Sequence, residues 1–436
     1  QPGDRKRLEF WPCKSDFPSV HALNKQIPFN KNLITSMMVC CTCQVLQAQV
    51  TVSTDFTDVE LQRQEMSNLW TVVNRISPRF GPGTRPELKL NLIRMIGGIN
   101  KVVDGVKVPD LDFDPCTYDT NTGTYVYNWD PLIERFDNIV NSGVAIHQVV
   151  LDQPPWAFQH GYTFIPEGTM DGVNFREDER VTGYGNSLPP ADKAAYHAFI
   201  QALITKLVET YGEELVMSWQ FRVGSEIETP DHWKGTEQDF IDHFANTVSA
   251  VRSVLPDAKI GIHTRKPDYL YRNGTVLNYK GEVIKSFADG LIEYCHDNDV
   301  RYDFWGTSDY VIITRAKDID MSGKYDRLFA PLVDHPKWNP DATLDIMEYK
   351  TVTTMNGADG GGTVNCVSSH RDIVELAFAQ QFYQHADQGL ENIFRWGNRP
   401  GSTDPIGISM LNTTNGQTRY ETQVTGTSAH AANQLD

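Results

Sequence analysis

Short apolar runs recur along the chain, and longer amphipathic stretches separate them. The runs are rich in Val, Ile, Leu and aromatic residues and nearly continuous in hydrophobicity, which is typical of parallel strands buried on both faces. They number seven and lie at residues 90–95, 145–151, 216–223, 259–263, 302–305, 344–348 and 392–396. We interpret them as the strands of a parallel sheet.

Two of the stretches between these runs show a helical pattern. Residues 190–211 place Phe199, Leu203 and Leu207 on one stripe, and residues 237–255 are similarly amphipathic. An apolar stripe of this kind packs a helix against a sheet. Strands that alternate with helices predict an α/β fold.

The number of strands decides between two architectures. A (β/α)8 TIM barrel needs eight parallel strands, so one more must lie near residues 125–127 or elsewhere in the gap around them. A doubly wound open sheet fits the alternation too and stays open as an alternative. We expect residues 49–400 to form the barrel. The polar residues 401–436 should form a short C-terminal extension with one or two extra strands.

Long aromatic segments follow two of the predicted strands. Residues 156–188 follow the second run, and residues 349–366 follow the sixth. In a barrel such segments build the loops of the C-terminal face, where active sites lie. Long loops at that face are typical of an enzyme with an extended substrate.

Composition and charge narrow the class of protein. The chain has 436 residues, of which 40% are hydrophobic, and this length suits one large domain. Its 56 acidic and 39 basic residues give a formal net charge of −17. Because such a field repels nucleic acid and anionic membranes, we expect neither as a partner.

The segment 31–48 has the order of a secretory signal peptide. A basic residue precedes an apolar run, which ends in small and polar residues at Ala48. The run is too short to span a bilayer as a helix, although a buried helix stays an alternative. We therefore predict a secreted or periplasmic protein without a membrane span. Residues 1–30 are interpreted as non-native or upstream sequence and are excluded from the fold prediction.

The cysteines and the Gly-rich segments indicate no cofactor. Beyond the predicted signal peptide the chain keeps Cys116, Cys295 and Cys366. Their wide spacing fits neither a CxxC metal site nor a disulfide framework, so at most one bridge is possible. P-loop and dinucleotide-binding fingerprints are absent from the sequence. We predict no metal and no cofactor.

Two glutamates lie at the ends of predicted strands. Glu226 comes just after the run 216–223, and Glu348 ends the run 344–348. An acid at the C-terminal end of a barrel strand points into the mouth, where its charge is costly unless it is paired or used. Either glutamate alone could be an ion-paired strand-end residue. Together they match a retaining glycosidase, in which one carboxyl protonates the leaving oxygen and the other, about 5 to 5.5 Å away, attacks the anomeric carbon.

The surroundings of both glutamates resemble motifs of clan A glycoside hydrolases, particularly the β-xylosidase and α-iduronidase family. Around the acid/base that family has apolar-apolar-Trp-Asn-Glu-Pro followed by Phe-Trp-x-Gly-Thr. The similar segments here are Val223-Gly224-Ser225-Glu226-Ile227 and His232-Trp233-Lys234-Gly235-Thr236. The segment Ile346-Met347-Glu348-Tyr349 resembles the apolar-Thr-Glu-Trp motif of the nucleophile. The resemblance implies a retaining hydrolase of oligo- or polysaccharides with Glu226 as acid/base and Glu348 as nucleophile.

The motif departs from the family at two positions. Ser225 replaces the Asn that bonds the sugar 2-hydroxyl, and Ile227 replaces the Pro after the acid/base. Ser225 can still donate a hydrogen bond, with a shorter reach. We therefore keep Ser225 as a substrate-binding candidate.

Further substrate-binding candidates follow from the resemblance. Arg94 lies where such enzymes place an arginine that holds the nucleophile ionised. Tyr310 lies where they have His-x-Tyr, and Trp396 lies where a tryptophan forms the floor under the sugar. Trp156, in the first long loop, and Trp233, in the acid/base motif, are further candidates. Core packing is the alternative for each aromatic residue.

Basic residues cluster near three strand ends. They are His263, Arg265 and Lys266 after one strand, Lys350 after Glu348, and Arg395 and Arg399 around Trp396. If they converge on the mouth, they favour a sulfated or carboxylated sugar, because Arg binds such groups with a bidentate fork. Surface ion pairs are the alternative. Since clan A includes enzymes that act on agar, porphyran and carrageenan, an algal galactan is the specific substrate hypothesis.

Two other functions stay open. One is a carbohydrate-binding barrel without turnover, which the Ser225 replacement would suit. The other is a β-xylosidase-like exo-glycosidase on neutral sugars. A metal-dependent isomerase or lyase would need several converging carboxylates and histidines, and no spacing in the sequence shows that set.

Overall fold

The fold was analysed in a computed structural model of the chain. The described residues are 50–54, 62–63, 72–75, 89–159, 181–182, 184–229, 232–265, 286–312, 323–354, 362–363, 389–396, 419–420 and 422–426. The predicted signal peptide and Cys366 lie outside these residues. Cys116 and Cys295 are buried free thiols.

Eight parallel strands pair in a closed ring. In ring order they are β3 (Val72–Arg75), β4 (Lys89–Leu92), β9 (Ala145–Val150), β12 (Gln220–Val223), β13 (Ile260–His263), β14 (Phe304–Ile312), β15 (Thr343–Thr354) and β17 (Leu390–Arg395). The ring closes where Arg395 of β17 lies opposite Val73 of β3. The barrel prediction is confirmed for the strands, and the open-sheet alternative is wrong because an open sheet has two unpaired edges.

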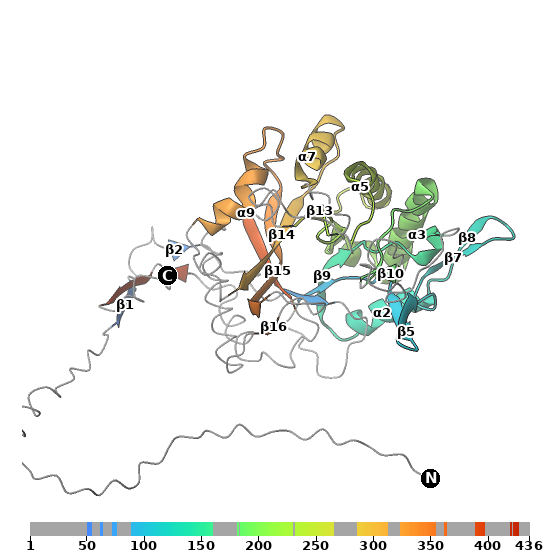
Figure 1. The fold of residues 1–436 in the computed structure, drawn as a ribbon, viewed down its shortest axis with the longest axis horizontal. Helices are drawn as coiled ribbons and strands as arrows, with labels where there is room; N and C mark the ends of the chain where they lie inside the picture. Colours follow the sequence, from blue (N-terminus) through green and yellow to red (C-terminus); the bar gives the residue numbers. More distant parts are fainter. Residues whose placement is uncertain are drawn as a thin grey trace, which may run out of the picture.

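Five helices in the described part of the chain connect successive strands and cover the outside of the sheet (Figure 1). They are α2 (Asp130–Val140), α3 (Lys193–Tyr211), α5 (Glu237–Arg252), α7 (Ala288–Asp297) and α9 (Lys324–Val333). The start of α5 is fixed by a capping box, in which Thr236 and Asp239 satisfy each other's backbone N–H groups. A short helix, α4 (Glu213–Met217), occupies the beginning of the predicted strand 216–223, so β12 begins only at Gln220.

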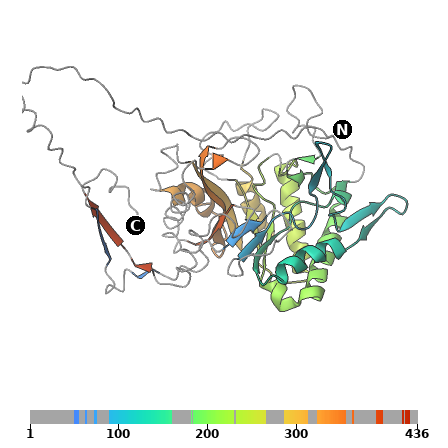
Figure 2. The ribbon, with the colours of Figure 1, turned by 90° about the horizontal axis from the view of Figure 1, so that it is seen from below.

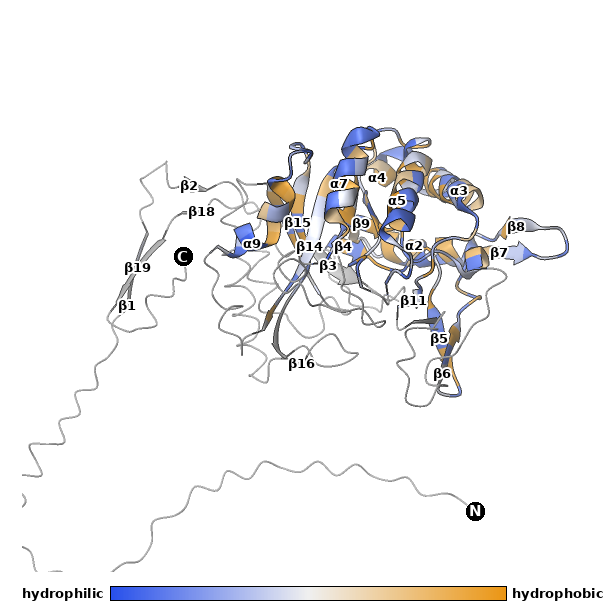
Figure 3. Cartoon of the chain, turned by 45° about the horizontal axis from the view of Figure 1, so that its top comes forward, coloured by the Kyte–Doolittle hydropathy of each residue, from blue (hydrophilic) through white to orange (hydrophobic). Residues whose placement is uncertain are grey.

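The eighth strand is β3, so it lies neither at residues 125–127 nor elsewhere in the gap where the sequence predicted it. These residues belong to β8 (Thr124–Tyr127), which pairs antiparallel with β7 (Cys116–Asp119). Asp119 bonds Asn121 and Thr122, and Gly123 is left-handed, so a tight turn folds the two strands into a hairpin. A second hairpin joins β5 (Asn100–Val103) and β6 (Val106–Pro109), and both project from the barrel (Figure 3).

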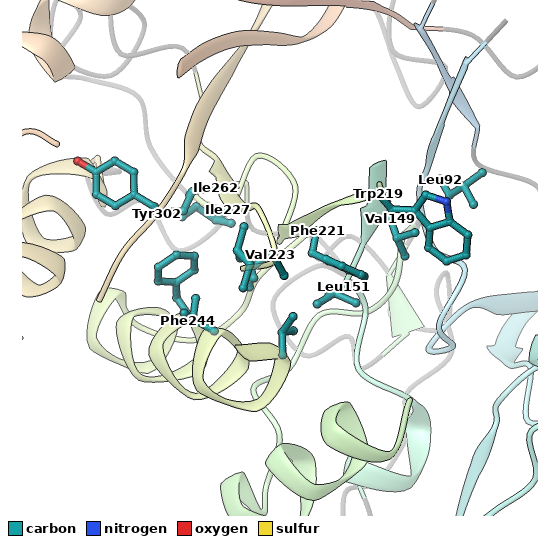
Figure 4. Close-up of a cluster of buried hydrophobic side chains, with 14 of the residues drawn as sticks. Leu92, Val149, Leu151, Trp219, Phe221, Val223, Ile227, Phe244, Ile262 and Tyr302 are labelled. Carbon is teal, nitrogen blue, oxygen red and sulfur yellow. The ribbon is translucent and has the colours of Figure 1, made fainter. Parts of the chain in front are cut away.

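The main core lies between the ring and its helices. Leu92, Val149, Phe221 and Ile262 point outward from four strands into this layer (Figure 4). The apolar faces of the helices pack on it, and their polar faces point to solvent (Figure 3). The strands are therefore held by a continuous apolar layer on the outer face of the barrel.

The inside of the barrel is markedly polar. Because side chains alternate along a strand, the residues between the outward-facing ones point inward. Buried polar residues at these positions are Asn91, Gln148, Gln220, Arg222, His263, Asp345 and Asn392. Phe304, Met347 and Phe394 form a small apolar cluster of their own. Since TIM barrels usually fill this space with branched apolar residues, the polar interior suggests a role beyond packing.

The C-terminal strands pair with the N-terminal part of the chain. β19 (Thr422–Gly426) pairs with β1 (Val50–Thr54), and β18 (Arg419–Tyr420) pairs with β2 (Gln62–Arg63). Figures 1 and 2 show the first pair beside the barrel. The remaining short strands are β10 (Val181–Thr182), β11 (Gly185–Asn186) and β16 (Gly362–Thr363). Among the helices that the structure describes, none is long and apolar enough to cross a membrane.

Candidate active site

The turn after β12 presents Glu226, whose side chain is half-buried. Gly224 (φ 75°) and Glu226 (φ 43°) both have left-handed backbones. A Cβ at position 224 would lie 2.5 Å from the Ile227 side chain and 3.1 Å from the Phe240 ring, so the turn needs glycine there. For Glu226 this conformation costs about 1 kcal/mol or more. Such residues concentrate at functional sites, where the surrounding structure holds them.

Glu228 ties this turn to the neighbouring elements. Its carboxylate accepts hydrogen bonds from the backbone N–H of Arg265 (2.7 Å) and of Phe287 (3.1 Å). Burial raises the pKa of Glu228 to about 7, against the opposing effect of these two bonds. Glu228 thus positions the turn of Glu226 rather than facing the mouth.

Glu348 lies within β15 beside a β-bulge. Thr307 of β14 lies opposite Ile346, whereas Ser308 lies opposite Glu348, so Met347 is an extra residue on β15. Bulges re-aim side chains and are frequent beside active sites. Glu348 is 5% exposed, and the Tyr310 hydroxyl donates a hydrogen bond to its Oε2 at 2.6 Å.

The groups around Glu348 have opposite effects on the pKa of its carboxyl. Burial and the nearby carboxylate of Glu226 raise the pKa of Glu348 to about 8, while Tyr310, Arg222 and Arg94 lower it. Two carboxylates that repel each other favour a shared proton. The pair can therefore hold one acid and one anion, which is the state that double displacement needs.

Arg94 lies just after β4 in a left-handed conformation (φ 59°). Its backbone N–H bonds Asp152 Oδ1 at 3.3 Å, and its guanidinium lies 4.2 Å from the centre of the Tyr184 ring. Burial lowers the pKa of Arg94, and the charges of Asp152, Tyr184 and Glu348 oppose this effect. Arg94 is thus held by two neighbours within range of Glu348.

Ser225, directly before Glu226, is hydrogen-bonded to two interior side chains. Arg222 Nη2 donates to its hydroxyl at 3.2 Å, and His263 Nδ1 lies 3.3 Å from the same oxygen. His263 Nε2 in turn lies 2.9 Å from the Ser308 hydroxyl. Burial lowers the pKa of His263 well below its usual value, so the imidazole is neutral. His232 Nδ1 lies 2.5 Å from the Ser225 carbonyl.

Comparison with known proteins places the chain in a family. The model of the glycosyl hydrolases family 39 matches residues 176–323. An α-1,4-L-rhamnosidase from Formosa agariphila is 32% identical over 394 residues, which cover 90% of this chain and 74% of the rhamnosidase. The chain belongs to glycosyl hydrolase family 39. It is therefore a glycosidase, and the resemblance to clan A is confirmed.

Solved structures support the same fold for this family 39 chain. A monomeric β-xylosidase from Caulobacter crescentus CB15 superposes with a TM-score of 0.53 at 15% identity, covering 84% of this chain and 72% of the xylosidase. A bacterial orthologue of human α-L-iduronidase gives 0.54 at 10% identity, covering 87% of this chain and 61% of the iduronidase. At these identities the similarity shows the barrel fold alone.

The family 39 barrel brings five of the predicted site residues close together. They are Arg94, Ser225, Glu226, Tyr310 and Glu348. Trp233 borders this group, because it lines a small cavity with Asp152, Ser225 and His232. Lys350 lies opposite Tyr310 in the β14–β15 pairing.

Other predicted substrate-binding residues are placed differently. Trp156 is 2% exposed and its indole N–H donates to the Ile99 carbonyl at 2.6 Å, so it fastens the start of the β5–β6 hairpin. His263 is fully buried inside the barrel. Arg265 uses its backbone to hold Glu228. Trp396 is half-buried, and its backbone N–H bonds the Tyr349 carbonyl. Lys266 and Arg399 lie outside the described residues.

Arg222 and Tyr184 were not predicted from the sequence to lie in the site, and Asp152 was interpreted there as a positioning or loop residue. Arg222 is a charged residue in the middle of a buried strand, and that violation of the hydrophobic pattern was the available signal. Asp152 follows β9 as Glu226 follows β12, so its strand-end position was a second signal. Tyr184 lies in a long loop, where nothing in the pattern distinguishes one aromatic residue from another.

Proposed function

We propose that this glycosidase works with retention, using Glu226 as acid/base and Glu348 as nucleophile. The hydrogen bond from Tyr310 to Glu348 Oε2 supports this assignment most strongly. It orients a buried carboxylate and lowers the cost of its negative charge. Glu226 lies at the same end of the barrel, because parallel strands share their C-terminal face.

The proposed reaction has two steps. In the first, the bond from the anomeric carbon to the leaving oxygen breaks, Glu226 gives its proton to that oxygen, and Glu348 bonds the anomeric carbon. In the second, Glu226 takes a proton from water, the water oxygen bonds the anomeric carbon, and Glu348 leaves as a carboxylate. Arg94, Arg222 and Tyr310 favour the charge that returns to Glu348.

The proposed substrate contains an α-1,4-linked L-rhamnosyl unit. The supporting observation is the similarity to the α-1,4-L-rhamnosidase of Formosa agariphila, which covers 90% of this chain. An anionic substrate, carrying sulfate or a carboxylate, is a finer proposal that depends on Arg265 and Lys350. Arg265 is half-buried beside the Glu226 turn, and Lys350 lies one strand position past Tyr349 at the same end of β15.

The test is hydrolysis by the purified protein of aryl α-L-rhamnosides, aryl β-xylosides and sulfated or uronic oligosaccharides. Proton NMR of the first sugar released should show α-L-rhamnose, the anomer of the substrate. A product of inverted configuration would contradict double displacement. A preference for β-xylosides would contradict the rhamnoside proposal and favour an exo-glycosidase that acts on neutral sugars. Binding without hydrolysis of any substrate would contradict the assignment of the two catalytic glutamates.

A further inference from the structure

Arg222 lies beneath the site, four residues before Glu226 in the interior of the barrel. It is fully buried in β12, where its backbone pairs with Val150 on one side and Gly261 on the other. An arginine in this position carries its charge permanently, because guanidinium does not deprotonate in proteins. Burying it without partners would cost several kcal/mol.

Arg222 makes few hydrogen bonds for so buried a cation. Nη2 bonds the Ser225 hydroxyl, whereas Nε and Nη1 have no hydrogen-bond partner among the residues described. The cost of burying its charge is offset by nearby carboxyl groups. The carboxyl groups around it are those of Asp152 after β9, Glu348 and Asp345 of β15, and Glu226 after its own strand.

The hydrogen bond from the Arg222 side chain to Ser225 enters a chain of contacts that crosses the barrel. Ser225 contacts His263 of β13, and His263 contacts Ser308 of β14. Ser308 is the residue opposite Glu348 in the β14–β15 pairing. The contacts thus run from the strand of the acid/base to the residue beside the nucleophile, and the neutral imidazole in the middle adds no charge.

We propose that Arg222 is a positioning residue for the glycosidase reaction, one that places a positive charge beneath the two carboxylates and fixes Ser225 next to Glu226. This inference rests on the proposed function. Arg222 acts through Glu348 and Ser225 and does not itself reach the sugar. The other groups that act on the charge of Glu348 are Arg94 from β4, Tyr310 from β14 and Glu226.

The test separates the charge of Arg222 from its hydrogen bond by three variants, measured as kcat/KM against pH on an activated aryl glycoside. Arg222→Met removes both features, Arg222→Gln keeps a donor for Ser225, and Arg222→Lys keeps the charge. Loss of the charge should move the acid limb of the profile to higher pH by about one unit or more, because the nucleophile must be ionised. Met and Gln should show this shift together with a roughly 10- to 100-fold loss at pH 6, and Lys should retain the limb near its wild-type position.

Arg135→Met is the matched control. Arg135 is a second buried arginine, which bonds the carbonyls of Met95 and Phe113. Its loss should lower the melting temperature and leave the acid limb in place. If Arg222→Met does not fold, the comparison of Arg222→Gln with Arg222→Lys still shows whether the charge of Arg222 sets the position of the acid limb. If the Arg222 variants fold and the acid limb of their pH profiles does not move, the role of Arg222 is overturned, although the wild-type activity still depends on Glu348. If the proposed function fails, the activity does not depend on Glu348 at all.

Discussion

The ends of β12 and β15 each present a glutamate, and they hold it in different ways. Glu226 lies half-buried on a left-handed turn, and none of the described residues hydrogen-bonds its side chain. Glu348 is almost fully buried, lies beside a bulge and accepts the Tyr310 hydrogen bond. A nucleophile needs fixed geometry and a stabilised charge, whereas an acid/base must change protonation state and reach the leaving group. The fixed geometry of Glu348 and the more open position of Glu226 are what the proposed assignment of nucleophile and acid/base relies on, and Tyr310 offsets part of the cost of burying the Glu348 charge.

Glu348→Gly should have the largest effect. Without a nucleophile, kcat/KM should fall by about 10⁴-fold or more. Added azide should restore part of the activity and give a glycosyl azide of inverted configuration, because the small anion enters from the side that Glu348 vacated. Glu293→Ala, a substitution of an exposed glutamate on α7, is the control and should be unaffected. An azide product of retained configuration would assign the nucleophile elsewhere.

Glu226→Ala should discriminate between leaving groups. Glycosides with poor leaving groups need the proton and should lose roughly 10²- to 10⁴-fold, while dinitrophenyl glycosides should retain most of their first-step rate. The losses on the two kinds of substrate are compared by measuring kcat/KM in the steady state and the rate of the initial burst of aglycone release. Equal losses on both would show that Glu226 does not donate the proton.

Glu226→Gln should shift the pH profile of the nucleophile. The negative charge of Glu226 is one of the causes that raise the pKa of Glu348 to about 8. Removing that charge lowers the pKa, so the acid limb of kcat/KM on an activated aryl glycoside should move to lower pH. A limb that stays in place, or moves upward, would mean that the two carboxylates do not interact.

Glu348→Gln should stabilise the fold, which is the smallest of the expected effects. The pKa of Glu348 is about 8 in the folded chain and near 4.5 when unperturbed, so the protonated form is the one that folding favours. This stabilisation is complete below about pH 4.5 and is lost as pH rises toward 8. The neutral amide should thus add about 1 to 3 kcal/mol at pH 8 and much less at pH 5. Thermal unfolding at both pH values measures the gain, and equal gains would contradict the ionisation of a buried Glu348.

The sequence was sufficient for the strands with strong outward-facing apolar pairs, such as Leu344 and Ile346 of β15. It was insufficient for β3, because only Val72 and Val73 of its four residues are apolar and the polar Asn74 and Arg75 follow them. The helix α4 was mistaken for part of a strand, since Glu213 to Met217 form little more than one turn. The local sequence pattern has little influence on the secondary structure of such short segments, and their tertiary contacts largely determine it.

The proximity of Glu226 and Glu348 could be predicted, because strand ends in a barrel converge on one face. The surroundings of these glutamates could not. His263 was expected among mouth cations, yet alternation along β13 points it inward, where it contacts Ser225 and Ser308 from two other strands. The grouping of Arg222 with Asp152 likewise depends on the order of strands around the ring, which no single segment encodes.

The most direct measurement is to trap the covalent intermediate with a slow-turnover fluorinated glycoside of the sugar that the enzyme hydrolyses. Digestion and mass spectrometry of the trapped protein then locate the glycosyl group. We expect it on Glu348, in a peptide that also contains Tyr349. A glycosyl group on Glu226, or inactivation that labels neither glutamate, would contradict the assignment of Glu348 as the nucleophile of this family 39 glycosidase.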